Sequence, residues 1–327
     1  MARPTDELDP IGRGREVILA EAEALVALAD ALDEHFVRAC ETIVALRRQL
    51  VVTGMGKSGH IARKVAATFA ATGTPAIYVH PGEAGHGDMG MLAAGDVLLV
   101  LSNSGSTAEL RPIMSFARRA GIPIIGMAAR RGSPVIEGAD VPLVVPRVVE
   151  ACSVNVAPTT STAVQLSLGD ALAMTVMDMR GVSRRDLGVL HPGGAIGLAL
   201  APVTELMHGP DRLPLVAEHA SMPQVISIMT TGCFGVAGVT DPAGRLVGVI
   251  TDGDLRRHFA MLDTASAAEV MTRRPKLIPA DMLAGEALQF LNGNRITAAF
   301  VVPGTGEGLQ APIGIIHIHD LLRHGVG

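Results

Sequence analysis

The first 180 residues alternate between helical and strand patterns. Apolar residues recur at helical spacing from Arg15 to Arg48, which predicts two packed helices at the start of the chain. Short, continuously apolar runs then alternate with helical segments: strands are expected at 50–53, 76–79, 97–102, 122–127 and 141–145, and helices at 57–72, 107–120 and 160–179. This alternation predicts an α/β fold with a doubly wound parallel sheet. Ligands of such folds bind at the carboxyl ends of the strands.

An internal duplication follows in the last third of the chain. A glycine-rich segment without a clear period, 183–197, separates it from the first part. Beyond this segment, two stretches align at an offset of about 65 residues, which indicates a repeat. Each copy is expected to contain a helix, two short strands and a helix that begins at Asp254 or Asp320. We therefore expect a domain over residues 1–202 and two repeats over 203–265 and 266–327.

Composition argues against several classes of partner. The net charge is −5 and the pI about 6.1, so no basic face for nucleic acid is expected. Apolar runs span about five residues, whereas a membrane helix needs roughly 20. Three cysteines lack the spacing of a metal site, and the start of the chain lacks the pattern of a signal peptide. These features predict a protein of the reducing cytoplasm that binds neither nucleic acid nor membrane.

The stretch VVTGMGKSGH, residues 51–60, contains glycine patterns of two nucleotide-binding loops. A dinucleotide fold needs an acidic residue about 20 positions later, where this chain has Val79 and His80. A P-loop needs glycine where the chain has Val51. Both interpretations fail. A strand-to-helix turn remains, whose backbone N–H groups, Lys57 and Ser58 can face a small anion, although such a turn can also be a plain connection.

Two further polar clusters follow predicted strands. LSNSGSTAEL, residues 101–110, places four hydroxyls before a helix, more than a single N-cap requires. APTTSTAV, residues 157–164, opens the next long helix, and there a simple cap is an equal alternative. Glu150 lies at a strand end in VVEACS. The sequence thus predicts a phosphate cradle at the carboxyl edge of the sheet.

Taken together and in order, these motifs resemble the sugar isomerase (SIS) domain, and more closely the arabinose-5-phosphate isomerases. The matching segments are GMGKSGHIARKVAATFAATGTPAIYVHPGEAGHGDMGM, LSNSGSTAEL, VEAC, APTTST and LHPGGAIG. The C-terminal repeats resemble a cystathionine-β-synthase (CBS) pair. The resemblance covers nearly the whole chain. It implies interconversion of D-ribulose 5-phosphate and D-arabinose 5-phosphate, without a cofactor or a metal, for the synthesis of Kdo, a component of lipopolysaccharide or capsule.

The resemblance also implies which residues act on the sugar. Aldose–ketose isomerisation needs a base, an electrophile for the enediolate oxygen and an acid that opens the sugar ring. Glu109, one turn into the predicted helix, can be the base, Lys57 the electrophile and His191 the acid, because imidazole titrates near neutrality. Which of Glu109 and Glu150 is the base stays open. The substrate-binding residues implied are Gly56, Ser58, Gly73, Thr74, His80, His86, Ser102, Asn103, Ser104, Ser106, Thr107, Thr160 and Ser161.

Departures from the family pattern bear on the ligands. The isomerases usually carry an acidic residue at Ser106 and Pro-Leu-Gly at Ser153-Val154-Asn155, which leaves the sugar preference open. In the repeats, Thr251 and Asp254 fit the pattern by which CBS pairs hold nucleotides, whereas His317 precedes Asp320 in the second copy. A nucleotide or nucleotide sugar is the regulatory ligand implied. The alternative is that the repeats pack subunits together.

Two other functions are compatible with parts of the sequence. The chain can be a non-catalytic sugar-phosphate sensor, although sensors of this kind usually carry a DNA reader with a basic face. It can also be a metal-dependent lyase or hydrolase that uses His80, His86 and Asp88, although the E-x-x-H spacing of Glu83 and His86 falls in a loop too glycine-rich for a helix. The resemblance implies a homotetramer.

Overall fold

The computed structural model describes residues 9–191, 195–304 and 308–326 of the chain. The chain forms two compact units, Met1–Ser183 and Arg184–Gly327. Each unit has its own hydrophobic core. The domain bounds expected at residues 202 and 265 stay a prediction.

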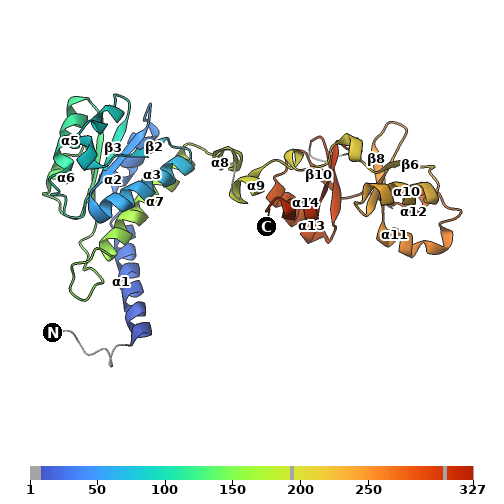
Figure 1. The fold of residues 1–327 in the computed structure, drawn as a ribbon, viewed down its shortest axis with the longest axis horizontal. Helices are drawn as coiled ribbons and strands as arrows, with labels where there is room; N and C mark the ends of the chain where they lie inside the picture. The colour runs from blue at the N-terminus through green and yellow to red at the C-terminus, as the bar shows by residue number, and fades with distance from the viewer. Residues whose placement is uncertain (1–8, 192–194, 305–307, 327) are drawn as a thin grey trace. The chain divides into compact units, whose positions relative to one another are not determined.

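The first unit is an α/β domain built around five short strands. Its elements are α1 (Pro10–Asp30), α2 (Glu34–Val44), β1 (Leu50–Gly54), α3 (Gly56–Ala71), β2 (Ala76–Tyr78), α4 (Pro81–Ala84), η2 (Asp88–Met91), β3 (Val97–Leu101), α5 (Leu110–Arg119), β4 (Ile124–Ala128), α6 (Pro134–Glu137), β5 (Val141–Val144) and α7 (Thr160–Met179). Figure 1 shows α5 and α6 on one face of the sheet, and α3 and α7 on the other.

The sheet has the order β2-β1-β3-β4-β5, and all its described pairings are parallel. This confirms the predicted doubly wound fold. Because the chain crosses from β2 on one side of β1 to β3 on the other, the strand order reverses between β1 and β3. In folds of this order, ligands bind at that switch point, beyond the carboxyl ends of the strands. The register pairs Gly54, the last residue of β1, with Leu101, the last of β3.

Two cores cover the two faces of this sheet. One joins α1, α2, α3 and α7 to the sheet through side chains such as Phe69 and Leu172, which are 0% exposed. The other lies under α5 and contains Leu98 and Ile113, also 0% exposed. The continuously apolar strands follow from this arrangement, because each strand is buried from both sides.

Several predicted boundaries are wrong by a few residues. The helix expected from Thr107 begins at Leu110, so Glu109 is its N-cap residue rather than a residue one turn inside. The loop after β2, expected to be too irregular for a helix, contains the single turn α4, with Pro81 at its first position. Proline is tolerated there because the first helical N–H needs no intrahelical partner.

The second unit begins with two short helices in the segment that showed no period, α8 (Arg184–Leu190) and α9 (Ala195–Leu200). The first repeat contains η3 (Val203–Glu205), η4 (Pro210–Arg212), β6 (Leu215–Ala217), α10 (Met222–Gly232), β7 (Val236–Thr240), β8 (Leu246–Thr251), α11 (Asp252–Arg257) and η5 (Phe259–Met261). The second contains α12 (Ala267–Val270), β9 (Thr272–Arg273), β10 (Leu277–Pro279), α13 (Ala284–Asn294), β11 (Ala298–Val302), β12 (Gly314–His317) and α14 (Ile318–Arg323), and its β9 pairs with β8 of the first repeat.

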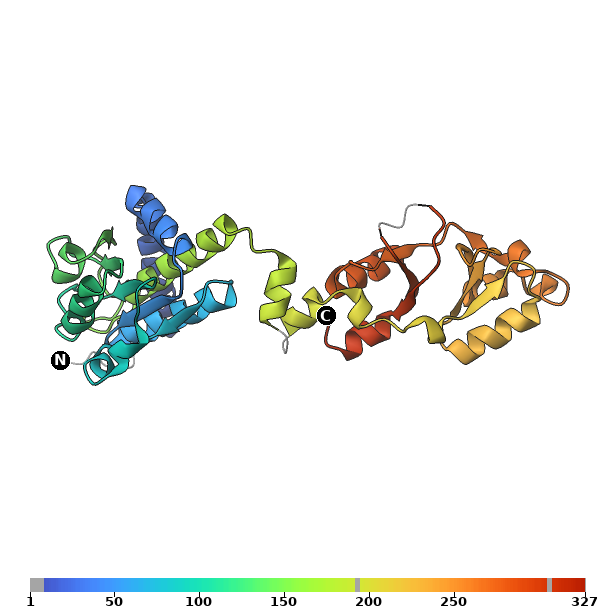
Figure 2. The ribbon, with the colours of Figure 1, turned by 90° about the horizontal axis from the view of Figure 1, so that it is seen from above.

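The two copies repeat the same strand pairing. β6 pairs with β7 in parallel and β7 with β8 in antiparallel orientation, and β10, β11 and β12 pair likewise. Figure 2 shows the strands and helices of both copies. A small core of side chains from both repeats, including Val236 and Phe300, joins them. The final helices begin at Asp252 and Ile318, two residues before the predicted Asp254 and Asp320, because Thr251 and His317 cap them.

No helix in the described part of the chain is long and apolar enough to cross a membrane. The cysteines Cys40, Cys152 and Cys233 are all free thiols.

Candidate functional site

The two predicted anion loops leave the sheet side by side. Because Gly54 pairs with Leu101, the turn at Met55 and the loop from Ser102 start at the same edge from neighbouring strands. Gly54 is required for this close approach: a Cβ there would lie 3.0 Å from the carbonyl oxygen of Leu101 and 2.9 Å from that of Ser58. Both loops therefore begin at the carboxyl edge, where the sequence predicts the phosphate cradle.

Both helices that follow these loops begin without a side-chain cap. The N-cap residue of α3 is Met55, and that of α5 is Glu109; neither side chain bonds to the helix start. Neither Ser104 nor Ser106 therefore caps α5, so a simple N-cap does not explain these two hydroxyls. Uncapped helix starts present backbone N–H donors and the positive end of the helix dipole, which together suit a phosphate.

Hydrogen bonds within the loop separate its hydroxyls into two groups. The Oγ of Ser102 is buried, accepts from the N–H of Gly105 at 3.0 Å and lies 3.0 Å from the Oγ1 of Thr107. It therefore braces the loop. Ser104 and Ser106 are exposed, as is Asn103, so their polar groups are accessible to a ligand. Gly105 has φ +67°, a conformation that favours glycine.

Helix α7 brings a third polar cluster towards this edge. At its C-terminal end, Arg180 donates to the carbonyl oxygens of Ile43 and Val44 at 3.0 and 3.4 Å. These residues end α2, which precedes the start of β1, so α7 ends at the amino edge of the sheet. A helix of 20 residues is about 30 Å long. Its first turn, with Thr160 and Ser161, therefore lies towards the carboxyl edge.

Glu150 caps α7. One of its carboxylate oxygens accepts from the backbone N–H of Thr159 at 2.8 Å and of Ser161 at 3.2 Å, and from the hydroxyl of Thr159 at 3.2 Å. Partial burial raises the pKa of Glu150, but the hydrogen bonds from Ser161 and Thr159 outweigh it, so the pKa is lowered and the group is ionised at neutral pH. Its carboxylate thus has a structural task in holding the loop after β5 to α7.

Lys57 and Glu109 differ from Glu150 in having no such partners. Both side chains are exposed, and within the described residues neither forms an ion pair or a side-chain hydrogen bond. Lys57 lies in the first turn of α3, and Glu109 stands at the start of α5. An ammonium group and a carboxylate at the ends of neighbouring strands can therefore serve a ligand without first breaking a protein contact.

The segments around β2 add a histidine at the same edge. His80 follows β2, which pairs with β1, and its Nδ1 accepts from the N–H of Gly82 at 3.2 Å. His86 is exposed. Thr74 is 1% exposed and its hydroxyl has no partner among the described residues; it follows Gly73 at the opposite, amino end of β2. His80 and His86 fit a substrate role better than Gly73 and Thr74 do.

Within residues 9–191, 195–304 and 308–326, no three His, Cys, Asp or Glu side chains are grouped so that they can hold a metal ion. His86 and Asp88 are both exposed. The proposed base and electrophile require no metal.

His191 belongs to the second unit and directly follows the last residue of α8. Its Nδ1 lies 2.8 Å from the carbonyl oxygen of Leu187. The following residues of the predicted motif, 192–194, lie outside the described residues. The role of His191 towards the sugar stays a prediction.

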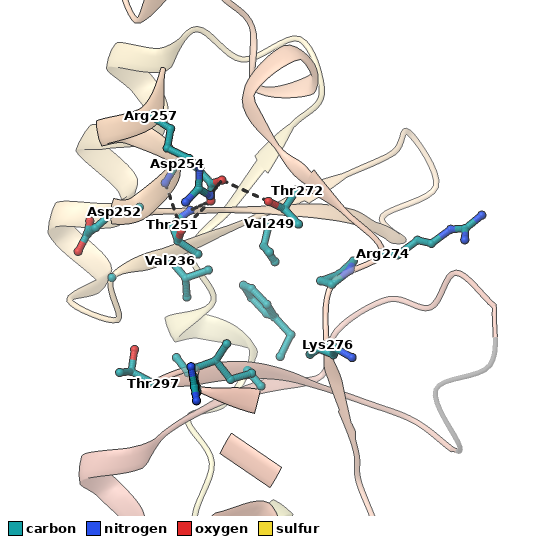
Figure 3. A pocket seen from close by; sticks show the side chains of 18 of the residues that line it. Val236, Val249, Thr251, Asp252, Asp254, Arg257, Thr272, Arg274, Lys276 and Thr297 are labelled. Atoms are coloured by element: carbon teal, nitrogen blue, oxygen red, sulfur yellow. Dashed lines mark hydrogen bonds and ion pairs between the residues drawn. The ribbon is translucent and has the colours of Figure 1, made fainter. Parts of the chain in front are cut away.

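A second site lies in the repeat unit, where a cavity of about 550 Å³ opens between the two copies. Side chains from both repeats face each other across it: Thr251, Asp254 and Thr272 on one side and Thr297 on the other (Figure 3). Its walls carry five basic side chains, Arg256, Arg257, Arg274, Lys276 and Arg295, against two acidic ones, Asp252 and Asp254. Such a cavity is large enough for a small organic anion.

Both carboxylate oxygens of Asp254 accept hydrogen bonds from neighbouring residues of this cavity. Its Oδ2 accepts from the N–H and the hydroxyl of Thr251 at 2.9 and 2.6 Å, while its Oδ1 accepts from Arg257 at 2.6 Å and from Thr272 at 3.2 Å (Figure 3). Burial raises the pKa of Asp254, but the bonds from Thr251 and Arg257 outweigh it and lower the pKa. Of these partners Arg257 faces solvent, because its side chain is 65% exposed while that of Asp254 is 4% exposed.

The equivalent position of the second repeat has a different partner. Asp320 accepts from Nε2 of His208 at 2.9 Å, and His317 caps α14 through its Nδ1. Burial, followed by the charge of His319, lowers the pKa of His317. In the second copy His317 therefore takes the place of Thr251, and Arg323, three residues after Asp320 as Arg257 is after Asp254, forms no ion pair with that carboxylate among the described residues.

Sequence reasoning missed two residues at the carboxyl edge. The hydroxyl of Tyr78 donates to the carbonyl oxygen of Gly54 at 3.1 Å, and the guanidinium of Arg63 lies 4.6 Å from its ring centre. Arg130, just after β4, donates to the hydroxyl of Ser106 at 3.1 Å. The signal for Arg130 was present, since Arg130-Arg131 follows a predicted strand at the carboxyl edge.

Comparison with known families agrees with this architecture. The SIS domain model matches residues 43–175, and the CBS domain model matches residues 203–261 and 267–327. The chain is thus a SIS-domain protein with a tandem CBS pair. It belongs to the arabinose 5-phosphate isomerase family. It is 42% identical to arabinose 5-phosphate isomerase KdsD of Pseudomonas aeruginosa over 98% of this chain and 99% of the relative.

Other relatives extend this result. KdsD of Yersinia pestis is 41% identical over 96% of this chain and 95% of its own length. Among solved structures, Escherichia coli CFT073 c3406 in complex with arabinose 5-phosphate is 34% identical, with a TM-score of 0.55, and covers 57% of this chain and 100% of its own. A putative phosphosugar isomerase involved in capsule formation from Bacteroides fragilis has the same identity and TM-score, with 57% and 99% covered.

Proposed function

We propose that the protein interconverts D-ribulose 5-phosphate and D-arabinose 5-phosphate through an enediolate. The observation that carries the proposal is the pairing of Gly54 with Leu101, which starts the Lys57 turn and the Ser102–Thr107 loop at one edge of the sheet. The substrates follow from the full-length similarity to KdsD enzymes and from the related protein solved with arabinose 5-phosphate. Formation of arabinose 5-phosphate would supply the synthesis of Kdo.

The phosphate would sit against the loop of Ser104 and Ser106 and the uncapped start of α5. Hydroxyls and helix N–H groups neutralise a phosphate by hydrogen bonds without adding a titratable group. This contact holds the sugar by its unreactive end, so that the carbons C1 and C2 can be placed between charged side chains. The isomerases usually carry an acidic residue where this chain has Ser106, so the preference for this sugar stays a prediction.

Glu109 is the base that the geometry favours. The base removes the proton from C2 of the aldose, the electrons of that C–H bond form the C1=C2 bond of the enediolate, and the carbonyl oxygen on C1 takes the negative charge. A proton then passes from the hydroxyl on C2 to the oxygen on C1, C2 becomes the carbonyl, and the protonated base returns its proton to C1. Glu150 is less suited, because proton uptake would weaken its three hydrogen bonds to α7. Lys57 would stabilise the enediolate oxygen, and His191 would open the sugar ring.

Deuterated water tests the reaction. Incubation of the protein with ribulose 5-phosphate should produce arabinose 5-phosphate with deuterium at C2, observed by NMR.

Glu109→Gln should lower kcat by roughly 10²–10⁴-fold, because general base catalysis contributes about that much. Glu83→Gln, on an exposed carboxylate of the neighbouring loop, is the matched control and should keep activity. An unchanged kcat in the Glu109 variant would show that Glu109 is not the base.

A chelator tests the alternative of a metal-dependent lyase or hydrolase. Activity that is retained in EDTA would argue against this alternative.

A second proposal concerns the cavity between the repeats. We infer that it binds a nucleotide or nucleotide sugar, because basic side chains surround a cavity of about 550 Å³ that also contains Thr251 and Asp254. The phosphates would contact the basic wall. A pair of ribose hydroxyls would replace Arg257 at Asp254, so binding would free a cation for the phosphates.

Calorimetric titration of the full chain with AMP and ATP tests this inference. Asp254→Asn should weaken binding at least tenfold, since the amide cannot accept from both ribose hydroxyls and Thr251. Asp320→Asn is the matched change in the other repeat and should have a smaller effect. Equal loss in both variants would place the ligand elsewhere.

The homotetramer and the cytoplasmic location remain proposals. An exposed apolar stripe on α1 supports self-association: Ile11, Ile18 and Val26 are 76%, 67% and 63% exposed. They recur at about two-turn spacing, which places them along one side of the helix. Unpartnered stripes of this kind commonly mark protein contacts.

A further inference from the structure

A hollow of about 490 Å³ lies at the carboxyl edge of the first unit, beyond β4 and β5. Three segments form it: residues 129–132 after β4, residues 144–147 at the end of β5, and Ala31 between α1 and α2. Arg130, Arg131 and Arg147 line it. It lies on the side of the edge away from Lys57, because β4 and β5 follow β3 in the order of the sheet.

The charge of this hollow is one-sided. Its described lining residues include three arginines and no Asp or Glu. In the part of the chain that the structure describes, none of the three forms an ion pair. The whole chain has a net charge of −5, so this concentration of unpaired cations is not a general property of its surface. Guanidinium groups match phosphate and carboxylate by paired N–H donors.

A chain of hydrogen bonds connects the hollow to the substrate loop. Arg130 donates to the hydroxyl of Ser106 at 3.1 Å, and the N–H of Ser106 donates to the hydroxyl of Ser104 at 3.2 Å. The N–H of Ala129 also donates to the carbonyl oxygen of Asn103 at 3.0 Å. A hydroxyl at position 106 accepts from Arg130 without neutralising it, so the guanidinium keeps its full charge beside the proposed sugar-phosphate site.

We propose that Arg130, Arg131 and Arg147 form a second anion-binding site, next to the substrate loop and separate from it. The site takes a phosphate or carboxylate group of a small, multiply charged anion. Arg131 and Arg147 bind the anion from the two strand ends, and Arg130 joins it to the loop of Ser106. An anion held there lies close enough to the loop to change the binding of the sugar phosphate.

Calorimetric titration of the full chain with pyrophosphate and, separately, with citrate tests the site. The double variant Arg131→Ala/Arg147→Ala removes two exposed side chains that form no hydrogen bond or ion pair among the described residues, so folding should be preserved. The matched control, Arg15→Ala/Arg119→Ala, removes the same charge from exposed positions on α1 and α5. Pyrophosphate bound by the substrate loops or by the repeats is retained in both variants.

We expect the Arg131/Arg147 variant to lose one bound pyrophosphate per chain, or to bind it at least tenfold more weakly, while the control matches the wild type. Citrate should follow pyrophosphate if the site accepts carboxylates, and should not bind there if it selects phosphate. Unchanged stoichiometry and affinity in the Arg131/Arg147 variant would overturn the proposal. An equal loss of pyrophosphate binding in the control variant would also overturn the proposal, because it would show that total charge and not this site governs binding. The single variants repeat the test if the double variant unfolds.

Discussion

At the scale of the residue, Gly105 shows how tightly the substrate loop is built. A Cβ at this position would collide with the hydroxyl oxygen of Ser133, and φ is +67°. Gly105→Ala should therefore displace the loop, with a loss of roughly 1–3 kcal/mol from the strained backbone and a large rise in KM for the sugar phosphate. Gly90→Ala, where a Cβ meets nothing within 4 Å, is the control. Similar kinetics for both variants would show that the loop tolerates the change.

The cap formed by Glu150 gives a prediction with a pH dependence. Glu150→Ala should destabilise the first unit by about 1–2 kcal/mol at pH 7, since the first turn of α7 loses its acceptor. The lowered pKa of Glu150 means that the carboxylate stabilises the fold above its ordinary value of 4.5, and that this contribution disappears as the pH falls through the lowered value. Urea unfolding of wild type and variant should therefore converge in acid.

Glu137→Ala, at an exposed carboxylate of α6, serves as the control for this measurement. A difference between wild type and Glu150→Ala that stays constant down to the acid limit would contradict the cap.

The role of a residue could be predicted from the sequence only where its immediate neighbours in the chain determine that role. The hydroxyl cluster 102–107 stood out because six polar or small residues follow an apolar strand. The contact of Arg130 with Ser106 depends on β4 lying beside β3, and the capping by Glu150 on the path of the chain back to α7. Contacts of this kind need the strand order, which hydrophobic periodicity does not contain.

At the scale of the element, long periodic segments were predicted well and short ones were not. The five strands and helices α3 and α7 lie where the apolar pattern placed them, within a few residues. Helices α4 and α6, with four residues each, are too short to show a period. The start of α5 was predicted three residues early because the serine cluster resembles a cap.

Helix α1 provides the element-scale prediction. If its exposed stripe packs against a second copy, Ile18→Asp/Val26→Asp should lower the oligomeric state, because charges would be buried in the contact. Light scattering after size exclusion measures the mass. Arg15→Asp/Glu23→Lys, which alters charge on exposed polar positions of the same helix, should leave the mass unchanged. An unchanged mass in the apolar variant would show that other surfaces hold the oligomer.

At the scale of the whole molecule, two units with separate hydrophobic cores predict two unfolding transitions. Arabinose 5-phosphate should raise the transition of the first unit more than that of the other, because most of the proposed sugar-binding residues lie in the first unit and a ligand stabilises the unit that binds it. Scanning calorimetry measures both. Phe69 and Phe300 are 0% and 1% exposed, one in each unit, so Phe69→Ala and Phe300→Ala form a matched pair.

Each of these substitutions should lower its own transition, at a cost of about 3–5 kcal/mol. The transition lowered by Phe69→Ala should respond more strongly to the sugar phosphate than the transition lowered by Phe300→Ala. A single transition that moves with either variant would show that the units unfold together.

Because β1 and β3 are adjacent in the sheet but apart in the chain, the enzyme can be divided into two fragments that each carry one of the two loops. Both loops of the proposed site leave adjacent strands, yet β2 and α3 lie between them in the chain. A cut in the exposed turn between Gly85 and Gly87 would separate the lysine from the serines without breaking a strand. Neither fragment alone would carry a complete cradle, and catalysis would return only when the two pieces rebuild one sheet. Recovered turnover would then report fragment assembly directly.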